Sequence, residues 1–444
     1  MITDQSASDA IHVAIRSAVE AILPQLEAAA RGAASLGALE AEVSAAVQTL
    51  GQHVVTVGAQ RMAVGPARVI PACPTCGQPL RRVGVRPRAV LGWFGVYPLT
   101  RPYWVCPQGH GGVAPADAVW GLGAGTLSPR LVAVLSRLAV DLPFDPVSAV
   151  IAATLGVAVD GETIRRTVEA VGQAVEAAEQ AAAAAPRPSR SAAAPDGIVL
   201  LADGAMIHTD AAWHEAKVGV CQPLVRTGPA TLTPQGPADY CVGFESRAAF
   251  WPRLFAHAVQ AGVLDPRCQL IALIGDGAHW IWDDGAAYFG EAGRELVEIL
   301  DFYHAAEHLA TVAHAVWGEG TPAAAAWWTQ QRAALLREGP APLFAALAAL
   351  TPPGDAAPAV VTRETAYFRY HQTRLNYPAY RARGLPIGSG QVEGACKVVL
   401  KQRLAQAGMR WRQAGAQAVA TLRARHRSGQ WDQLWAAGTP RAAA

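Results

Sequence analysis

The 444-residue chain lacks several features that would assign it to a class at once. It contains no uncharged apolar run of about 18 residues, the length that a membrane-spanning helix requires, so we expect no transmembrane segment. Its first residues include acidic side chains and no basic leader, which argues against a secretory signal. Its seven cysteines are an odd number and do not pair off as in a disulfide framework. A protein of the reducing cytoplasm is therefore expected.

Charge is scarce and unevenly distributed. Charged residues make up 16% of the chain and the net charge is +2, yet residues 61–116 contain seven arginines and no Asp or Glu. Residues 363–444 contain 14 Lys or Arg against three acids. Either segment alone could be an ordinary solvated surface. Two such segments in a nearly neutral chain favour a polyanionic partner, because neutralisation of phosphates drives nucleic-acid affinity.

Residues 1–65 predict an N-terminal helical region. Apolar residues recur at helical spacing on both sides of a break near Gly32, which indicates two Ala-rich helices. Such a region could mediate oligomerisation or cap the domain that follows, and the sequence does not decide between them.

Residues 66–120 predict a zinc-ribbon-like β module. A C-x2-C knuckle is followed about 30 residues later by a second knuckle, and the segment between them predicts a hairpin. A four-cysteine ribbon needs a cysteine at position 109, where this chain has glycine, so the next residue is the nearest replacement. A degenerate knuckle without metal is the alternative. The expected zinc ligands are Cys73, Cys76, Cys106 and His110.

Residues 121–180 predict a helix-turn-helix DNA-binding domain. Ser128 can cap a first helix, a second ends at Gly156, and a third carries Arg165 and Arg166 after a tight turn. Generic packing of three helices explains this pattern nearly as well.

A low-complexity stretch at 181–196 predicts a linker, and residues 431–444 predict a tail. Between them, residues 197–430 predict three strands, a helix, a fourth strand, and a fifth strand with its helix. This order is close to that of a ribonuclease-H-like sheet. An Ala- and Trp-rich helical insertion is expected at about 318–384. The fold class is therefore a multidomain one that combines α+β and α/β parts.

Three carboxylates are the candidate catalytic residues. Asp203 and Asp276 each follow an apolar run and precede glycine, as at the end of a buried strand. Their strands would be neighbours, and Glu393 would return to the same sheet edge on a helix after a Gly-Ser-Gly turn. Such a triad could bind two Mg²⁺ or Mn²⁺ ions for phosphoryl transfer. Alternatively, the aspartates only cap loops through Asx-type hydrogen bonds.

Basic residues follow Glu393 closely. Lys397 and Lys401 stand four and eight residues later, on one helix face, where a phosphodiester could lie. A pair of solvated lysines is the alternative. The expected DNA contacts are Lys397, Lys401, Arg403, Arg410 and Arg412, with Arg165 and Arg166 from the helix-turn-helix segment.

One motif favours a different function, that of a zinc peptidase. His304, Glu307 and His308 match H-x-x-E-H, the inverted zinc-peptidase pattern, in which both histidines share a metal. A peptidase would need a further carboxylate ligand downstream. It would also leave Asp203, Asp276 and the basic segments unexplained.

Read in order, LLADGAMIHT, LIGDGAHWIW, ILDFYHAAEHL and LPIGSGQVEGACK…MRW resemble DDE-type insertion-sequence transposases of the ISKra group, which are related to ISL and Mutator-like enzymes. The resemblance implies a ribonuclease-H-like fold with Asp203, Asp276 and Glu393 as the metal-binding triad. It also assigns Asp301 and His304 to a D-x-x-H signature after the fifth strand. The second knuckle of the family usually has C-x2-C, from which this chain departs.

The resemblance implies a bacterial, nucleoid-associated enzyme that binds the terminal inverted repeats of its own element. It would hydrolyse a phosphodiester at the element end and join the freed 3′-hydroxyl to target DNA. The expected cofactors are Mg²⁺ or Mn²⁺ at the triad and Zn²⁺ at the knuckles. The expected partners are double-stranded DNA and a second copy or more of the chain, with no membrane. A catalytically inactive DNA-binding derivative and the zinc peptidase are the alternatives.

Overall fold

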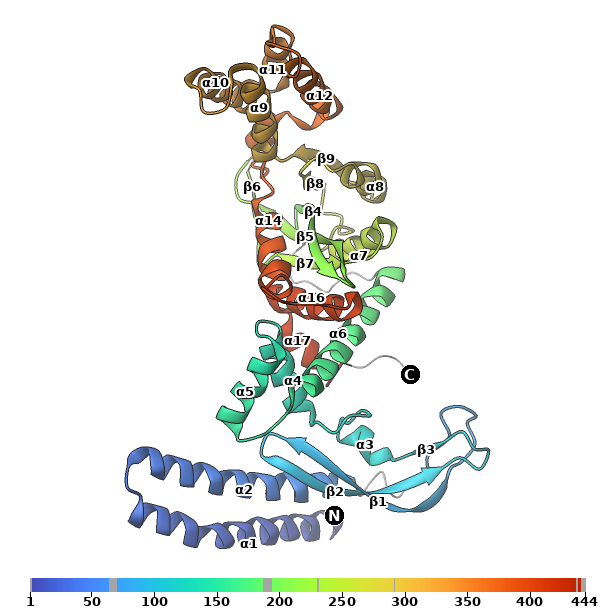
Figure 1. Cartoon of the computed structure of the whole chain (residues 1–444). Coiled ribbons are helices and arrows are strands. Elements are labelled where there is room, and N and C mark those ends of the chain that lie inside the picture. The colour runs from blue at the N-terminus through green and yellow to red at the C-terminus, as the bar shows by residue number, and fades with distance from the viewer. Residues whose placement is uncertain are drawn as a thin grey trace. The chain divides into compact units, whose positions relative to one another are not determined.

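The computed structural model describes residues 2–63, 70–186, 194–229, 231–290, 292–436 and 438–440. The chain divides into two compact units (Figure 1), Met1–Val171 with Gln433–Arg441 and Gly172–Asp432 with Ala442–Ala444. The division falls inside helix α6 (Gly161–Ala184), ahead of the predicted linker, of which 187–193 lie outside the described residues. No helix in the described ranges is long and apolar enough to cross a membrane.

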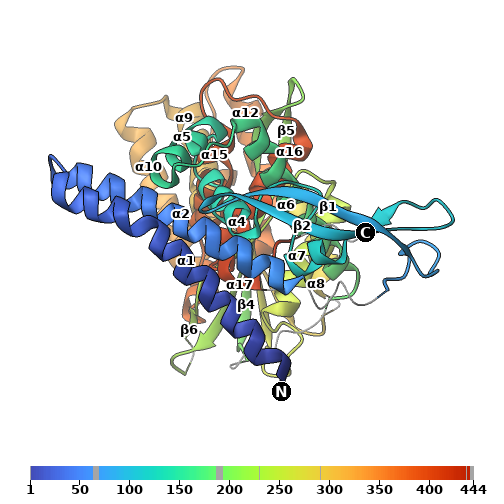
Figure 2. The same cartoon turned by 90° about the horizontal axis from the view of Figure 1, so that it is seen from below.

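The first unit begins with the predicted helical hairpin. Helices α1 (Ile2–Gly32) and α2 (Leu36–Met62) lie side by side in both views (Figure 1, Figure 2). The Ser35 hydroxyl accepts a hydrogen bond from the Ala38 N–H and so caps α2. The predicted break after Gly32 is therefore confirmed as a helix end followed by a new N-cap.

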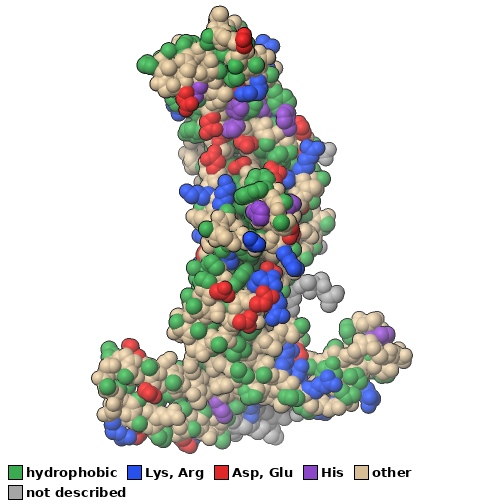
Figure 3. Space-filling model, viewed as in Figure 1, with side chains coloured by type: hydrophobic (Ala, Val, Ile, Leu, Met, Phe, Trp, Pro, Cys, Tyr) green, Lys and Arg blue, Asp and Glu red, His purple; other side chains and the backbone are tan. Residues whose placement is uncertain are grey.

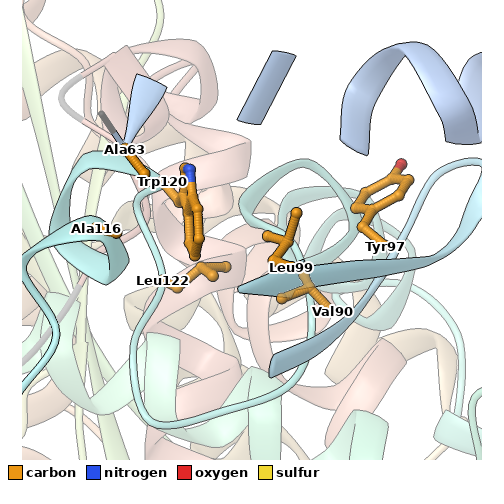
Figure 4. Close-up of a cluster of buried hydrophobic side chains, with 7 residues drawn as sticks. All are labelled: Ala63, Val90, Tyr97, Leu99, Ala116, Trp120 and Leu122. Atoms are coloured by element: carbon orange, nitrogen blue, oxygen red, sulfur yellow. The ribbon is translucent and has the colours of Figure 1, made fainter. Parts of the chain in front are cut away.

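A three-stranded antiparallel sheet follows, and its long hairpin is the one that the sequence predicts. A hydrophobic cluster packs this sheet against the end of α2 (Figure 4), and the Trp120 indole N–H donates to the Ala59 carbonyl at 2.6 Å. The cluster consists of Ala63, Val90, Tyr97, Leu99, Ala116, Trp120 and Leu122. The elements are β1 (Arg81–Gly92), β2 (Gly95–Val105), β3 (Gly112–Val113) and α3 (Pro115–Val119).

Three helices follow in the first unit, which also contains the described residues 433–436 and 438–440. Helix α4 (Pro129–Ala139) begins at the predicted cap, Ser128, whose hydroxyl accepts from the Leu131 N–H at 3.3 Å. Helix α5 (Phe144–Leu155) ends at a left-handed glycine, and α6 follows after a short turn. Helix α6 continues to Ala184, and of its residues after Val175 only Glu179 is buried.

The second unit is built on a mixed six-stranded sheet with the order β6-β5-β4-β8-β9, in which β7 also pairs with β5. Strand β4 is antiparallel to β5 and parallel to β8, and β8 is parallel to β9. Strands β4 and β8 are buried where they pair, as their apolar runs predict. The strands are β4 (Gly197–Thr209), β5 (Ala212–Arg226), β6 (Leu232–Pro234), β7 (Asp239–Gly243), β8 (Leu270–Gly275) and β9 (Glu295–Leu300).

One predicted strand end is wrong. The sequence predicts that the first strand stops at Asp203, but β4 continues to Thr209. The parallel pairing with β8 does stop there, at Ala202 opposite Gly275, whereas the antiparallel pairing with β5 continues to the turn. The end of the apolar run therefore marks where the pairing of β4 with β8 stops, and not where β4 itself stops.

The remaining helices of the chain include those of the predicted insertion, and the last of them, α17, belongs mostly to the first unit. Helix α9 follows β9 directly, and four α-helices of the insertion stand between it and the segment that carries Glu393. The helices are α7 (Arg247–Gln260), α8 (His279–Gly290), α9 (Phe302–Trp317), α10 (Pro322–Glu338), α11 (Pro340–Ala348), α12 (Ala357–Tyr370), α13 (Tyr377–Ala382), α14 (Gly390–Ala395), α15 (Gln402–Leu404), α16 (Gln413–Arg427) and α17 (Trp431–Ala436).

A buried ion network joins three helices of the second unit. Glu179 on α6 accepts from Arg253 on α7 at 2.6 Å and from Arg425 on α16 at 2.7 Å. A second Arg253 nitrogen lies 2.5 Å from Glu245. The Glu179 and Arg253 side chains are almost fully buried, so neither charge has water as a substitute partner.

We expect Glu179→Gln to lower the free energy of unfolding by about 3–5 kcal/mol, because it leaves two guanidinium groups without their shared countercharge. Urea denaturation of the full chain measures the change. Glu176→Gln is the matched control, one turn earlier on α6, and should cost less than about 1 kcal/mol. Equal effects of the two changes would contradict a special role for the network.

Candidate active site and metal centre

Asp203 and Asp276 lie next to each other at one edge of the sheet. Each residue directly follows the last paired position of two adjacent parallel strands, Ala202 on β4 and Gly275 on β8. Burial raises the pKa of Asp203, and the negative charges of Asp276 and Glu393 raise it further. Asp276 and Glu393 therefore both lie close enough to Asp203 to act on its carboxylate electrostatically.

Local hydrogen bonds hold the two aspartates. Asp203 accepts from the Gly204 N–H at 2.7 Å and from the Cys396 thiol at 3.4 Å. Asp276 accepts from the Ala278 N–H at 3.1 Å, which is the Asx-type bond of the alternative interpretation. These bonds fix the side chains, but turn capping alone does not require a third carboxylate nearby.

The turn after Asp276 contacts the helical insertion. The Tyr367 hydroxyl on α12 donates to the Asp276 carbonyl at 3.3 Å. Gly277 has a φ of +105°, and a Cβ there would lie 2.6 Å from the same hydroxyl. A glycine is therefore required at this position both by its backbone conformation and by the close approach of α12.

Asp301 determines where Glu393 lies. Its buried carboxylate accepts from the N–H groups of Tyr303 at 2.6 Å and His304 at 3.2 Å, and so caps α9. Its other oxygen accepts from the Ser389 N–H at 2.6 Å and from the Ser389 hydroxyl. Ser389 in turn contacts Glu393 at 3.4 Å. Asp301, the aspartate of the predicted D-x-x-H signature, therefore has a structural role. It binds Ser389 and so holds the segment that contains Glu393.

Glu393 lies on the exposed side of the short helix α14. A π-helical turn, η3 (Cys396–Lys401), follows directly. Buried Arg423 on α16 donates to the Val399 carbonyl of this turn at 2.8 Å and also contacts the Val398 carbonyl. Sequence reasoning missed Arg423, although an arginine inside the apolar run AVATLRA is a usable signal.

The predicted DNA-contact residues fall into two groups. Lys397, Lys401, Arg410 and Arg412 are exposed, and Lys401 lies close enough to Cys396 to act on its thiol electrostatically. Arg403 is 1% exposed, and its guanidinium lies 5.0 Å from the centre of the Trp411 ring. The prediction that Arg403 contacts DNA is therefore wrong, because an arginine inside the core cannot reach a phosphate.

The arginines of the first unit differ in exposure. Arg165 forms ion pairs along α6 with Glu162 at 2.6 Å and Glu169 at 2.5 Å, which raise its pKa. Arg166 is 67% exposed and stands 3.8 Å from Glu162. Of the two, Arg166 is the more accessible to a ligand.

The predicted zinc ligands converge in the first unit. The donor atoms of Cys73, Cys76, Cys106 and His110 all lie within 4.8 Å of one another, so this cluster could bind a metal such as zinc. The Cys76–Cys106 sulfur separation is 3.7 Å, and the His110 Nδ1 lies 3.6 and 3.9 Å from the sulfurs of Cys106 and Cys73. Ligands about 2.0–2.3 Å from a tetrahedral Zn²⁺ stand about this far apart.

The backbone explains why His110, and not residue 109, lies beside the three thiols. Gly109 has a φ of +80° in the second knuckle, a conformation that a cysteine would adopt only with strain. The next residue therefore presents the ligand. The N–H of Cys76 lowers the pKa of Cys73 to about 6, which favours the thiolate that zinc requires.

Among the described residues, the knuckle cluster is the one set of three or more potential ligands packed this tightly. His304 and His308 lie beside each other but gain no third ligand within that limit, so the three-ligand peptidase site is not formed there. The three carboxylates are spaced more widely.

A scan against protein-family models gives no match to this chain, and a search of curated proteins gives no significant match. Function is therefore inferred from the residues and their geometry.

We expect purified wild-type chain to contain about one zinc ion, and Cys106→Ser or His110→Ala to lose it. Metal analysis by plasma emission after gel filtration measures the content. His53→Ala, an exposed histidine of the same unit, is the control and should leave the zinc content unchanged. Full zinc occupancy in His110→Ala would show that this histidine is not a ligand.

Proposed function

We propose that the chain is a DDE-type transposase of the ISKra group, with a ribonuclease-H-like catalytic domain at 197–430. The observation that carries the proposal is the convergence of Asp203 and Asp276 from adjacent parallel strands with Glu393 from α14. The strand order β6-β5-β4-β8-β9 and the mixed strand directions support the proposed fold.

The donor set fits hard divalent cations, because carboxylate oxygens are the ligands that Mg²⁺ and Mn²⁺ prefer. Asp203, Asp276 and Glu393 would hold two such ions. When bound, the ions would supply Lewis-acid activation of the attacking oxygen and stabilisation of the leaving oxygen of a phosphodiester.

The protein's own groups would position the DNA. The exposed Lys397 and Lys401 follow Glu393 on the same segment, so their ammonium groups can pair with phosphates beside the scissile bond. The Cys396 thiol and the Gly204 N–H hold the Asp203 carboxylate in place. A water molecule would attack the element end, and the freed 3′-hydroxyl would then attack a phosphodiester of target DNA.

The first unit would supply DNA recognition. Helices α4, α5 and α6 follow the order of a helix-turn-helix, with Arg166 exposed near the start of the third helix. The strand β1 of the ribbon-like module carries exposed arginines and no acid. We assign to these elements the binding of the terminal inverted repeats, with a homodimer or higher oligomer forming on the DNA.

Asp203→Asn, Asp276→Asn and Glu393→Gln should each lower Mg²⁺-dependent strand transfer by at least about 10²-fold, since each removes a charge on which the reaction depends. Transfer is measured on duplexes that carry the inverted repeats flanking the gene. Binding to the same duplexes should persist, because the DNA-binding elements are unchanged.

Asp283→Asn is the matched control, an exposed acid on α8 that should leave transfer intact. Transfer that survives in the three triad variants would refute the assignment. A wild-type chain that binds the repeats but performs no transfer would instead favour a catalytically inactive DNA-binding protein.

A further inference from the structure

Two histidines on α9 face each other. His304 and His308 stand one turn apart, and their Nε2 atoms are 3.3 Å apart. Both side chains are partly exposed, at 34% and 25%. Figure 3 shows histidine and acidic side chains gathered on one face of the second unit. The pair is thus accessible to a small ion from solvent.

The ring of His308 is fixed by the helical insertion. Its Nδ1 lies 2.5 Å from Glu364, a buried carboxylate on α12 that also pairs with Arg363 at 2.7 Å. The Tyr367 ring stacks on the imidazole at 3.7 Å with an interplanar angle of 15°. Because Glu364 is buried, it has no water to replace His308 as a partner. The His308 ring therefore keeps its Nε2 directed at His304.

The contacts of the two rings leave both Nε2 atoms available to one ion. A neutral imidazole carries one N–H. On His308, the 2.5 Å contact with Glu364 favours an N–H on Nδ1. On His304, the N–H can stand on Nδ1, which lies 3.4 Å from the exposed Glu307, or on Nε2, from which it donates to His308. In the first tautomer both Nε2 lone pairs point at each other across 3.3 Å, so that one cation can bind both.

We propose that His304 and His308 bind one first-row transition-metal ion through their Nε2 atoms, with Glu364 and Glu307 orienting the rings. Two ligands about 2.0–2.1 Å from a tetrahedral ion lie about 3.3–3.4 Å apart, which matches the observed separation. A carboxylate on the second ring nitrogen is the usual support of a histidine ligand. The remaining coordination positions face solvent.

The ligand chemistry separates this site from the other two. Imidazole nitrogens favour Zn²⁺, Ni²⁺, Co²⁺ or Cu²⁺ over Mg²⁺, whereas the carboxylates of Asp203 and its neighbours suit hard ions such as Mg²⁺ and Mn²⁺. The ion would also link α9 to the insertion through Glu364. The site does not depend on the proposed transposase activity, because its ligands are outside the carboxylate triad.

Ni²⁺ titration of the full-length chain by calorimetry tests the site without DNA. Zinc is left in the knuckles and millimolar Mg²⁺ is present, so that both other sites are occupied. Wild type should bind about one Ni²⁺. His304→Ala and His308→Ala should weaken that binding by at least about 10-fold, and Glu364→Gln by about 10–100-fold. Glu307→Gln should have a smaller effect, because this carboxylate is 77% exposed.

His314→Ala is the matched control, an exposed histidine on the same helix that should leave nickel affinity unchanged. Thermal unfolding shows whether each variant is folded. If His308→Ala disturbs folding, the test rests on His304→Ala. Unchanged nickel affinity in His304→Ala would overturn the proposal. A wild-type chain that binds no nickel would also overturn it, if the ¹⁵N chemical shifts of the two imidazoles showed that the pair carries a third proton at neutral pH.

Discussion

The buried carboxylate of Asp301 is the constraint on which the candidate active site depends. Its N–H donates to the Gly275 carbonyl at 2.8 Å, so the end of β9 is tied to the end of β8, one residue before Asp276. Its side chain caps α9 and binds Ser389, which returns from the far side of the helical insertion. One residue thereby brings Glu393 to the edge where Asp203 and Asp276 lie. Loss of this carboxylate would release the Glu393 segment without removing any carboxylate of the triad.

The potential metal ligands of the described residues fall into three groups by donor type. Carboxylate oxygens gather at the sheet edge, thiols and one imidazole at the knuckles, and two imidazoles on α9. With metal bound at the proposed sites, hard and borderline ions would occupy different positions within one polypeptide. The insertion is part of this arrangement, because α12 supplies Tyr367 to the Asp276 turn and Glu364 to His308. Its helices consequently support the site chemically as well as sterically.

Much of this could be predicted from the sequence, and the failures have physical causes. Five of the six described strands of the second unit were predictable, because buried apolar runs such as LIALI leave few alternatives. Strand β6 was not predicted, because its three residues are too few to show a pattern. The end of β4 was not predictable. The strand continues because it pairs with β5, and the local sequence pattern does not reveal that partner. Arg403 resembled a surface cation, but tertiary packing against Trp411 buries it. The role of Asp301 could not be predicted, because it depends on a contact with Ser389, 88 residues later in the sequence. The turn η3 has no composition signal of its own.

The most direct test of the central claim is a crystal structure of the chain soaked in Mn²⁺, with the ions located by their anomalous scattering. The account predicts two peaks about 3.5–4 Å apart, bound by Asp203, Asp276 and Glu393. Peaks absent from this edge of the sheet while Mn²⁺ occupies another part of the molecule would contradict it.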